Sequence, residues 1–229
     1  MPNSVFTALL GTGFTFLMTI AGSSVVFFFS KEIPDKLHKA FLGFAAGVMM
    51  AASIWSLMIP SIEQAQTLGF PGWFPASMGF LAGALFLFLF KPIKKIPLLL
   101  LSITLHNIPE GMAVGLAWPL ALGIGIQNFP EGAAVSLPLR KKGLSKTKAF
   151  LLGSATGIVE PIFGCLAILL AQHATVLMPW LLAFAAGAMI YVVVEELIPE
   201  AHFGESSSIG TISTIFGFLL MMILDVSFS

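Results

Sequence analysis

Apolar residues run along almost the whole chain in long stretches, with short polar connections between them. A helix needs about 20 apolar residues to cross the ~30 Å hydrocarbon core of a bilayer, and eight stretches are long enough or nearly so. They span residues 4–29, 38–61, 73–91, 96–117, 119–139, 146–171, 177–199 and 209–227. We therefore predict an all-α membrane protein whose eight transmembrane helices form one domain, residues 1–229.

The composition agrees with this prediction. Hydrophobic residues make up 57% of the chain and charged residues 10%, and the mean hydropathy is +0.98, far from an average soluble domain. The net charge is zero, and no basic cluster resembles a surface for nucleic acid, so we expect none as a partner. Cys165 is the only cysteine, which excludes a disulfide within the chain and a thiolate metal cage.

The positive charges predict an orientation in the bilayer. All eleven Lys and Arg residues fall in the connections after the first, third and fifth predicted helices. These residues are Lys31, Lys36, Lys39, Lys91, Lys94, Lys95, Arg140, Lys141, Lys142, Lys146 and Lys148. Positively charged loops stay in the cytoplasm, so both termini are predicted to be extracytoplasmic. The acidic connection at 200–208 lies on the same side and is the one exception.

Short matches relate the first three predicted helices to the last three. The sequence FAAGVM at Phe44–Met49 returns as FAAGAM at Phe184–Met189, 140 positions later, and flanking matches have offsets of 138 and 142. Because the charge pattern gives the two triplets opposite directions, the repeat is inverted, as is typical of transporters with an ion site near the midplane. The predicted arrangement is 3+2+3, with repeats at 1–92 and 146–229 around a central pair at 96–139.

The central pair carries two related motifs in otherwise uncharged sequence. His106–Gly111 reads HNIPEG, and Gln127–Gly132 reads QNFPEG. A carboxylate at the centre of a membrane helix costs roughly 2.5–3.5 kcal/mol on insertion scales, so glutamates there point to a bound cation. Each proline also frees a backbone carbonyl beside the polar residues, and each glycine allows a neighbouring helix to approach closely.

Helical spacing brings these polar residues together. Residues four apart share a helix face, so Glu110 lies beside His106 and Glu131 beside Gln127. The two helices are antiparallel, and a turn near Trp118 would place both glutamates at similar depth. Two adjacent metal ions bridged by shared carboxylates would suit this arrangement.

Other polar residues extend the candidate set. The candidate metal ligands are His106, Asn107, Glu110, Gln127, Asn128, Glu131 and Glu160, with Met49, Glu195 and Glu196 as further candidates. Met49 could instead be a core methionine, and Glu195 and Glu196 could be a solvated pair at a helix end. Glu110, Glu131 and Glu160 could be hydrogen-bonded for structural reasons. Glu63 and Asp225 are expected near the outer surface, where they could steer cations. His173 and His202 are expected to be ordinary loop residues.

The ligand types indicate which metals are suitable. Oxygen atoms with one imidazole suit Zn²⁺, Fe²⁺, Mn²⁺, Co²⁺ or Cd²⁺ and argue against Cu⁺, which favours thiolate and thioether. Metal binding to crowded carboxylates in a low dielectric should also displace protons.

The motifs together resemble the ZIP family, the Zrt-/Irt-like divalent-metal transporters. The resemblance rests on HNxPEGxxxG at 106–115, the second NxPEG, Glu160-Pro161 and EExxPExH at 195–202. It is similar to the prokaryotic branch whose fifth-helix motif begins with Gln. The resemblance implies a multi-pass protein of the bacterial inner membrane that takes up zinc and related divalent metals into the cytoplasm without ATP, and that can form a homodimer.

The resemblance also implies ligand sets and a motion. One metal ion would use His106, Glu110, Gln127 and Glu131, with Met49 possible, and the second would use Asn107, Glu110, Asn128, Glu131 and Glu160. Helices 1, 4, 5 and 6 would move against helices 2, 3, 7 and 8.

Two departures from the family pattern bear on selectivity. The connection at 91–95 has no histidine, whereas many relatives carry a His-rich loop there. Gln127 and Asn128 stand where other relatives carry His and Asp, which favours a broader range of metals than zinc alone.

Two other functions remain open from the sequence. The motifs do not separate a carrier from a passive cation channel, because both need a site at the midplane. An intramembrane metallohydrolase is disfavoured because the HExxH arrangement is missing and Glu200 stands where an arginine is expected. We therefore expect a transporter rather than an enzyme.

Overall fold

A computed structural model describes residues 5–29, 34–90, 98–116, 121–202 and 207–228. The α-helices are α1 (Val5–Ser24), α2 (Asp35–Ala52), α3 (Ile59–Thr67), α4 (Trp73–Phe90), α5 (Leu98–Leu116), α6 (Ala121–Lys141), α7 (Lys146–Ala155), α8 (Val159–Leu169), α9 (Ala171–Val192), α10 (Ile198–His202) and α11 (Ser207–Phe228). The 3₁₀ segments are η1 (Val25–Phe28) and η4 (Thr156–Ile158), and the π-helical segments are η2 (Ser53–Met58) and η5 (Val193–Leu197). Every regular element in the described part of the chain is helical, which confirms the all-α class.

Five described helical stretches are long and apolar enough to cross a membrane. They are Val5–Phe28, Asp35–Thr67, Lys146–Leu169, Thr175–His202 and Ser208–Ser227, and Trp73–Leu89 is a shorter apolar helix. The predicted ranges 96–117 and 119–139 correspond to α5 and α6, which contain the prolines and polar residues of the motifs. The predicted turn at Trp118 and the basic residues at positions 31 and 91–95 lie outside the described residues.

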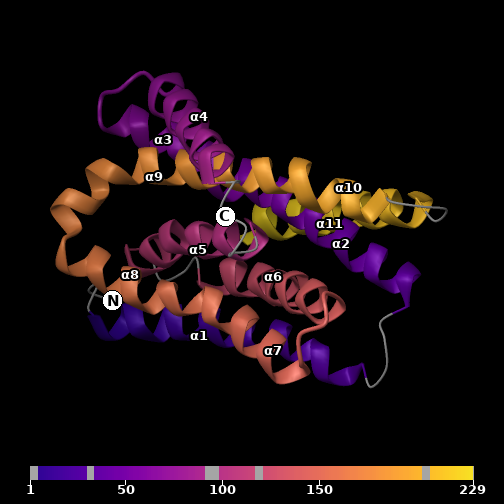
Figure 1. Ribbon diagram of the computed structural model, residues 1–229. Coiled ribbons are helices and arrows are strands. Elements are labelled where there is room, and N and C mark those ends of the chain that lie inside the picture. The colour runs from indigo at the N-terminus through magenta and orange to yellow at the C-terminus, as the bar shows by residue number, and fades with distance from the viewer. Residues whose placement is uncertain (1–4, 30–33, 91–97, 117–120, 203–206, 229) are drawn as a thin grey trace.

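The helices form two groups in Figure 1. The α1 group contains α1, α5, α6, α7 and α8, and the α2 group contains α2, α3, α4, α9, α10 and α11. The α2 group packs mainly through α2 with α11 and α4 with α9, and the α1 group through α1 with α6 and α5 with α8. These contacts match in pairs if the first three predicted helices are equivalent to the last three and the two central helices to each other. The contact of α2 with α11 then corresponds to that of α9 with α4, and the contact of α1 with α6 to that of α8 with α5. The two groups meet where α5 packs on α9 and α6 on α2.

Glycines at related positions bring helices of the α2 group into close contact. A Cβ added to Gly47 of α2 would overlap the Thr214 carbonyl of α11, and one added to Gly187 of α9 would overlap the Phe80 carbonyl of α4. Both glycines occupy the same place in the FAAG repeat. In a bilayer no hydrophobic effect drives helices together, so their association depends on the close backbone packing that such small residues allow.

The two π-helical segments also occupy related positions. Each is followed closely by a proline, Pro60 after η2 and Pro199 after η5. A proline has no backbone N–H to donate, and the missing hydrogen bond favours a local change of helical pitch. η2 has six residues and η5 has five. The repeat offset accordingly falls from 140 at Met49 and Met189 to 139 at the prolines.

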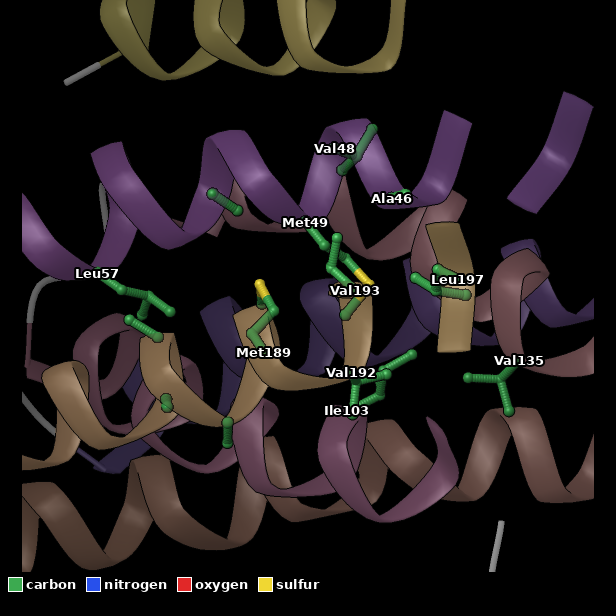
Figure 2. Packing of buried hydrophobic residues seen from close by; sticks show 14 of the residues in the cluster. Ala46, Val48, Met49, Leu57, Ile103, Val135, Met189, Val192, Val193 and Leu197 are labelled. Carbon is green, nitrogen blue, oxygen red and sulfur yellow. The ribbon is translucent and has the colours of Figure 1, made fainter. Parts of the chain in front are cut away.

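The main hydrophobic core joins the two groups. Figure 2 shows Val48 on α2, Met189 and Val192 on α9, Ile103 on α5 and Val135 on α6 within one buried cluster. Because these side chains are fully or nearly fully buried, the core fixes how α5 and α6 meet the α2 group. That boundary contains the polar residues of the motifs.

Candidate metal centre

His106, Glu110 and Glu131 converge at the boundary between α5 and α6. Nε2 of His106 lies 2.9 Å from Oε1 of Glu110 and 3.5 Å from Oε1 of Glu131. One ligand atom from each of the three residues lies within 4.8 Å of the other two. All three side chains are at most 2% exposed. Helical spacing produces the predicted contact of His106 with Glu110, and the packing of α6 against α5 adds Glu131.

Gln127 connects this cluster to the α2 group. Its amide nitrogen donates a hydrogen bond to Glu110, and Ser56 of η2 donates to its amide oxygen over 3.5 Å. The Ser56 hydroxyl also lies 2.7 Å from Oδ1 of Asp225 on α11. A polar path therefore leads from Asp225 through Ser56 to the site.

Asn107 on α5, Asn128 on α6 and Glu160 on α8 form a second buried polar group. Nδ2 of Asn128 donates to Oε1 of Glu160 over 2.9 Å, and Nδ2 of Asn107 donates to the Thr156 carbonyl over 3.1 Å. The three side chains are at most 1% exposed. Glu160 stands at the second position of α8, directly after the 3₁₀ turn η4.

Close backbone contacts bring α5, α6 and α8 into these positions. A Cβ added to Gly111 would lie 2.5 Å from the Glu160 Cα, and one added to Gly132 would lie 2.8 Å from the Ser23 backbone nitrogen. Ser23 also donates to the Gly132 carbonyl over 3.2 Å. The close approach expected at both motif glycines is therefore present, and it places Glu160 beside the first motif.

Many of the clustered polar atoms are buried without a hydrogen-bond partner among the described residues. These atoms are both ring nitrogens of His106, Oδ1 of Asn107, Oε2 of Glu110, Oδ1 of Asn128, both carboxylate oxygens of Glu131 and Oε2 of Glu160. A buried polar group without a partner costs roughly 1–3 kcal/mol, so such a concentration demands another partner. One imidazole with several carboxylate and amide oxygens is a ligand set for borderline and hard divalent cations.

The remaining candidate ligands lie elsewhere. Met49 is fully buried in the apolar core shown in Figure 2. Glu195 is exposed and Glu196 half-buried in η5, so they are not part of the buried cluster. The structure therefore gathers seven of the ten candidates into the two polar groups described above.

The polar residues outside the motifs also have defined places. Glu63 on α3 is exposed. His202 contacts the Ile198 carbonyl and the Thr211 hydroxyl, both at 2.8 Å, which fits a structural role. The side chain of His173 lies outside the described residues.

A cavity of about 100 Å³ reaches Glu110 from the side of α11. Its lining includes Trp55, Ser56, Ile124 and Asp225. The predicted topology had placed Asp225 near the outer surface as a residue that could steer cations, but the sequence analysis did not single out Ser56. The only signal for Ser56 is a hydroxyl residue in an apolar segment four positions before a proline.

Comparison with known proteins identifies the class. A family model described as ZIP zinc transporter matches residues 95–225. The zinc transporter ZIP11 of Xenopus tropicalis is 38% identical, over 98% of this chain and 98% of the relative. The zinc transporter GufA of Myxococcus xanthus is 35% identical over 86% of this chain and 90% of its own. The zinc transporter ZIPB of Bordetella bronchiseptica is 34% identical over 96% and 81%.

Such matches define a multi-pass membrane protein of a metal-transporter class, which is not a class of enzymes. The chain belongs to the ZIP zinc transporter family. The family resemblance predicted from the motifs is thereby confirmed, and the matched relatives are eukaryotic as well as bacterial.

Proposed function

We propose that this protein takes up zinc and related divalent transition metals into the cytoplasm, without ATP, through a buried site for two metal ions. The observation that carries the proposal is the convergence of His106, Glu110 and Glu131 at the boundary between the two helix groups. The first ion is held by these three residues and by Gln127. The second is held by Asn107, Asn128 and Glu160 together with the two shared glutamates.

The charges of the ligands support two ions of unequal affinity. His106 and Gln127 are neutral ligands, so Glu110 and Glu131 match the charge of one divalent ion. The second ion gains only the Glu160 carboxylate and the neutral Asn107 and Asn128 oxygens. Since Coulomb attraction grows with the net charge of the site, the second ion binds more weakly and the two binding steps are separable.

The packing of the helices supports a carrier with eight membrane spans in an inverted 3+2+3 repeat. The helix pairs, the close glycines Gly47 and Gly187 and the π-helical segments recur at related positions. With the basic connections on the cytoplasmic side, as the positive-inside rule favours, the proposed arrangement has both termini outside the cell membrane. The cavity at Asp225 then faces outward and gives metal access to Glu110.

A carrier must also expose its site to each side in turn. The α1 group holds most of the ligands, and the α2 group contributes Ser56 and Asp225 at the outer side. On the inner side the repeat-related segment η5 contains Glu195 and Glu196. We infer that the α1 group moves relative to the α2 group, so that the ions leave past these two glutamates.

Uptake of radioactive zinc into reconstituted vesicles without ATP tests the proposal. We expect saturable uptake by the unaltered protein and none by Glu110→Ala or Glu131→Ala, because each glutamate serves both ions. The matched control is Glu63→Ala, which removes an exposed glutamate outside the cluster and should leave uptake at saturating zinc unchanged. Transport by Glu110→Ala at normal expression would contradict the site, and uptake that never saturates would indicate a channel. Competition by unlabelled manganese, iron and cadmium in the same vesicles defines the metal range.

Cysteine labelling in intact cells tests the orientation. In a Cys165→Ala background, Thr67→Cys lies at the exposed end of α3 and should react with an impermeant reagent from outside. Lys142→Cys, after α6, should react only when the cells are opened. The reverse pattern would contradict the proposed topology.

A further inference from the structure

A second cavity, of about 250 Å³, lies between α2, α6 and α11, where the two helix groups meet. We call it the lateral cavity. Its lining includes Phe44 and Val48 of α2, Phe129 and Ala133 of α6, and Leu220 of α11. Of the described residues that line it, only Gln127 is polar. The lateral cavity therefore differs in chemistry from the cavity at Asp225, which is lined by several polar side chains.

The lateral cavity opens toward the hydrocarbon of the bilayer. Phe129 is 40% exposed and Leu220 is 37% exposed at its edge, and α2 and α11 belong to stretches long and apolar enough to cross a membrane. A buried water needs two to four polar partners, and even a smaller apolar cavity, of about 150 Å³, stays dry and binds a hydrocarbon ligand. A hydrocarbon chain from the bilayer is therefore the occupant that fits this lining.

The depth of the lateral cavity matches the length of one leaflet. Asp35 at the start of α2 and Lys141 at the end of α6 are both exposed and form an ion pair of 3.1 Å. At 1.5 Å per residue, Phe44 lies about 14 Å along α2 from this pair, and Ala133 lies about 12 Å along α6 from it. Half of the ~30 Å hydrocarbon core is about 15 Å. An acyl chain whose head group lies at the ion pair would therefore reach the cavity.

Basic residues gather at this end of α2 and α6. The lysine cluster consists of Lys36 and Lys39 on α2, and Lys141 and Lys142 at and just after the end of α6. The described carboxylates at this end are Asp35, which pairs with Lys141, and Glu200, which contacts His38 of α2. Four lysines and two carboxylates leave an excess of two positive charges. Basic clusters between transmembrane helices are typical binding sites for anionic lipid head groups.

We propose that the lateral cavity holds one acyl chain of an anionic phospholipid whose head group lies on the lysine cluster. The cavity supplies the apolar half of this site and the lysines supply the charged half. Because α6 belongs to the α1 group, whereas α2 and α11 belong to the α2 group, the bound lipid bridges both groups. Its chain also excludes water from the side of Gln127 that faces the bilayer. This inference is independent of the number of metal ions.

Native mass spectrometry of the purified full-length protein in detergent tests the charged half of the site. The probes are phosphatidylglycerol and phosphatidylcholine with the same acyl chains. We expect one tightly held phosphatidylglycerol per chain and weaker binding of phosphatidylcholine. Lys36→Gln combined with Lys142→Gln should weaken phosphatidylglycerol binding about 5-fold for each lysine, or about 25-fold together, and leave phosphatidylcholine unchanged. Lys148→Gln is the matched control, because this exposed lysine on α7 lies outside the cluster and its loss should change neither lipid.

Two larger side chains test the apolar half. Ala133→Leu fills part of the lateral cavity, and Leu220→Trp adds bulk at its edge. Each should weaken binding of both lipids about 15-fold, the effect expected if about two methylene groups leave the cavity. Leu81→Trp is the control, because Leu81 is 52% exposed on α4 and does not line the cavity. Thermal unfolding in detergent verifies that the variants are folded.

Three results would overturn the proposal. Equal binding of both lipids that the lysine substitutions do not change would exclude an anionic head group. Full lipid binding in both Ala133→Leu and Leu220→Trp would show that no chain occupies the cavity. A dimer that dissociates in Leu220→Trp, without bound lipid in the unaltered protein, would assign the cavity to a second copy of the chain.

Discussion

Nε2 of His106 and Oε1 of Glu110 lie 2.9 Å apart in the buried interior, one helical turn from each other on α5. Their separation is that of an ion pair when the imidazole is protonated, although neither ring nitrogen of His106 has a well-aligned hydrogen-bond partner among the described residues. Two close ligand atoms whose lone pairs converge are what a metal ion requires. The testable consequences of a cation between them concern selectivity, pH, access and packing.

Replacing Gln127 by histidine should shift selectivity toward zinc. The Gln127 amide reaches Glu110 and is therefore placed to ligate the first ion. Imidazole is a better ligand than an amide for Zn²⁺, whereas Mn²⁺ prefers oxygen. We expect the ratio of zinc to manganese uptake to rise in Gln127→His vesicles. A ratio equal to that of the unaltered protein would show that this side chain does not contact the metal.

Metal affinity should fall as the pH is lowered from about 7.5 to 5.5. The ligands must be deprotonated to bind metal, so protons compete for the same oxygen and nitrogen atoms. With Glu110, Glu131 and Glu160 close together, more than one proton should be released per metal ion. Cadmium titration in weak buffer measures both quantities. Affinity that is independent of pH, with no proton released, would contradict the competition.

The sequence predicted the contact between His106 and Glu110 because that contact depends on spacing along a single helix. His106 and Glu110 are four residues apart, and their contact follows from helical geometry alone. The hydrogen bond from Asn128 to the Thr15 carbonyl could not be predicted in this way. A backbone carbonyl has no sequence signature, and this one meets Asn128 only because α1 packs against α6.

Asp225→Asn should raise the KM for zinc and leave the maximal rate of transport nearly unchanged. The Asp225 carboxylate lines the cavity that leads to Glu110, and a negative charge in a confined opening raises the local concentration of cations. We expect a several-fold higher KM for zinc with a similar maximal rate. Glu63→Gln provides the comparison, because its exposed charge is screened by salt and its loss should change KM less. Equal KM values for Asp225→Asn and the unaltered protein would exclude this route.

Gly47→Ala should destabilise the α2 group. The added methyl group would overlap the Thr214 carbonyl of α11, and overpacking of this kind typically costs about 1–3 kcal/mol. Gly13→Ala is the control, because no atom lies within 4 Å of the added Cβ. Thermal unfolding in detergent should show a lower midpoint for Gly47→Ala and none of that loss for Gly13→Ala. Equal midpoints would mean that α2 and α11 are not packed as closely as described.

The fold shows the same division between what the sequence predicts and what packing decides. The ranges of the helices follow from apolar length, and the repeat follows from matches such as the FAAG segments at Gly47 and Gly187. The π-helical segments were not predicted. Their difference in length does appear in the sequence, because the repeat offset is 140 at Met49 and 139 at Pro60. Met49 was a candidate ligand, and the structure places it in the apolar core, because a buried methionine and a ligand methionine look alike in sequence.

The central claim is that Glu110 and Glu131 are shared by two ions whereas Glu160 serves only one. The most direct measurement is the number of cadmium ions bound per chain at equilibrium for the purified protein and two variants. We predict two ions for the unaltered protein, none for Glu131→Ala and one for Glu160→Gln. Two ions in Glu131→Ala, or the same number in both variants, would contradict the account.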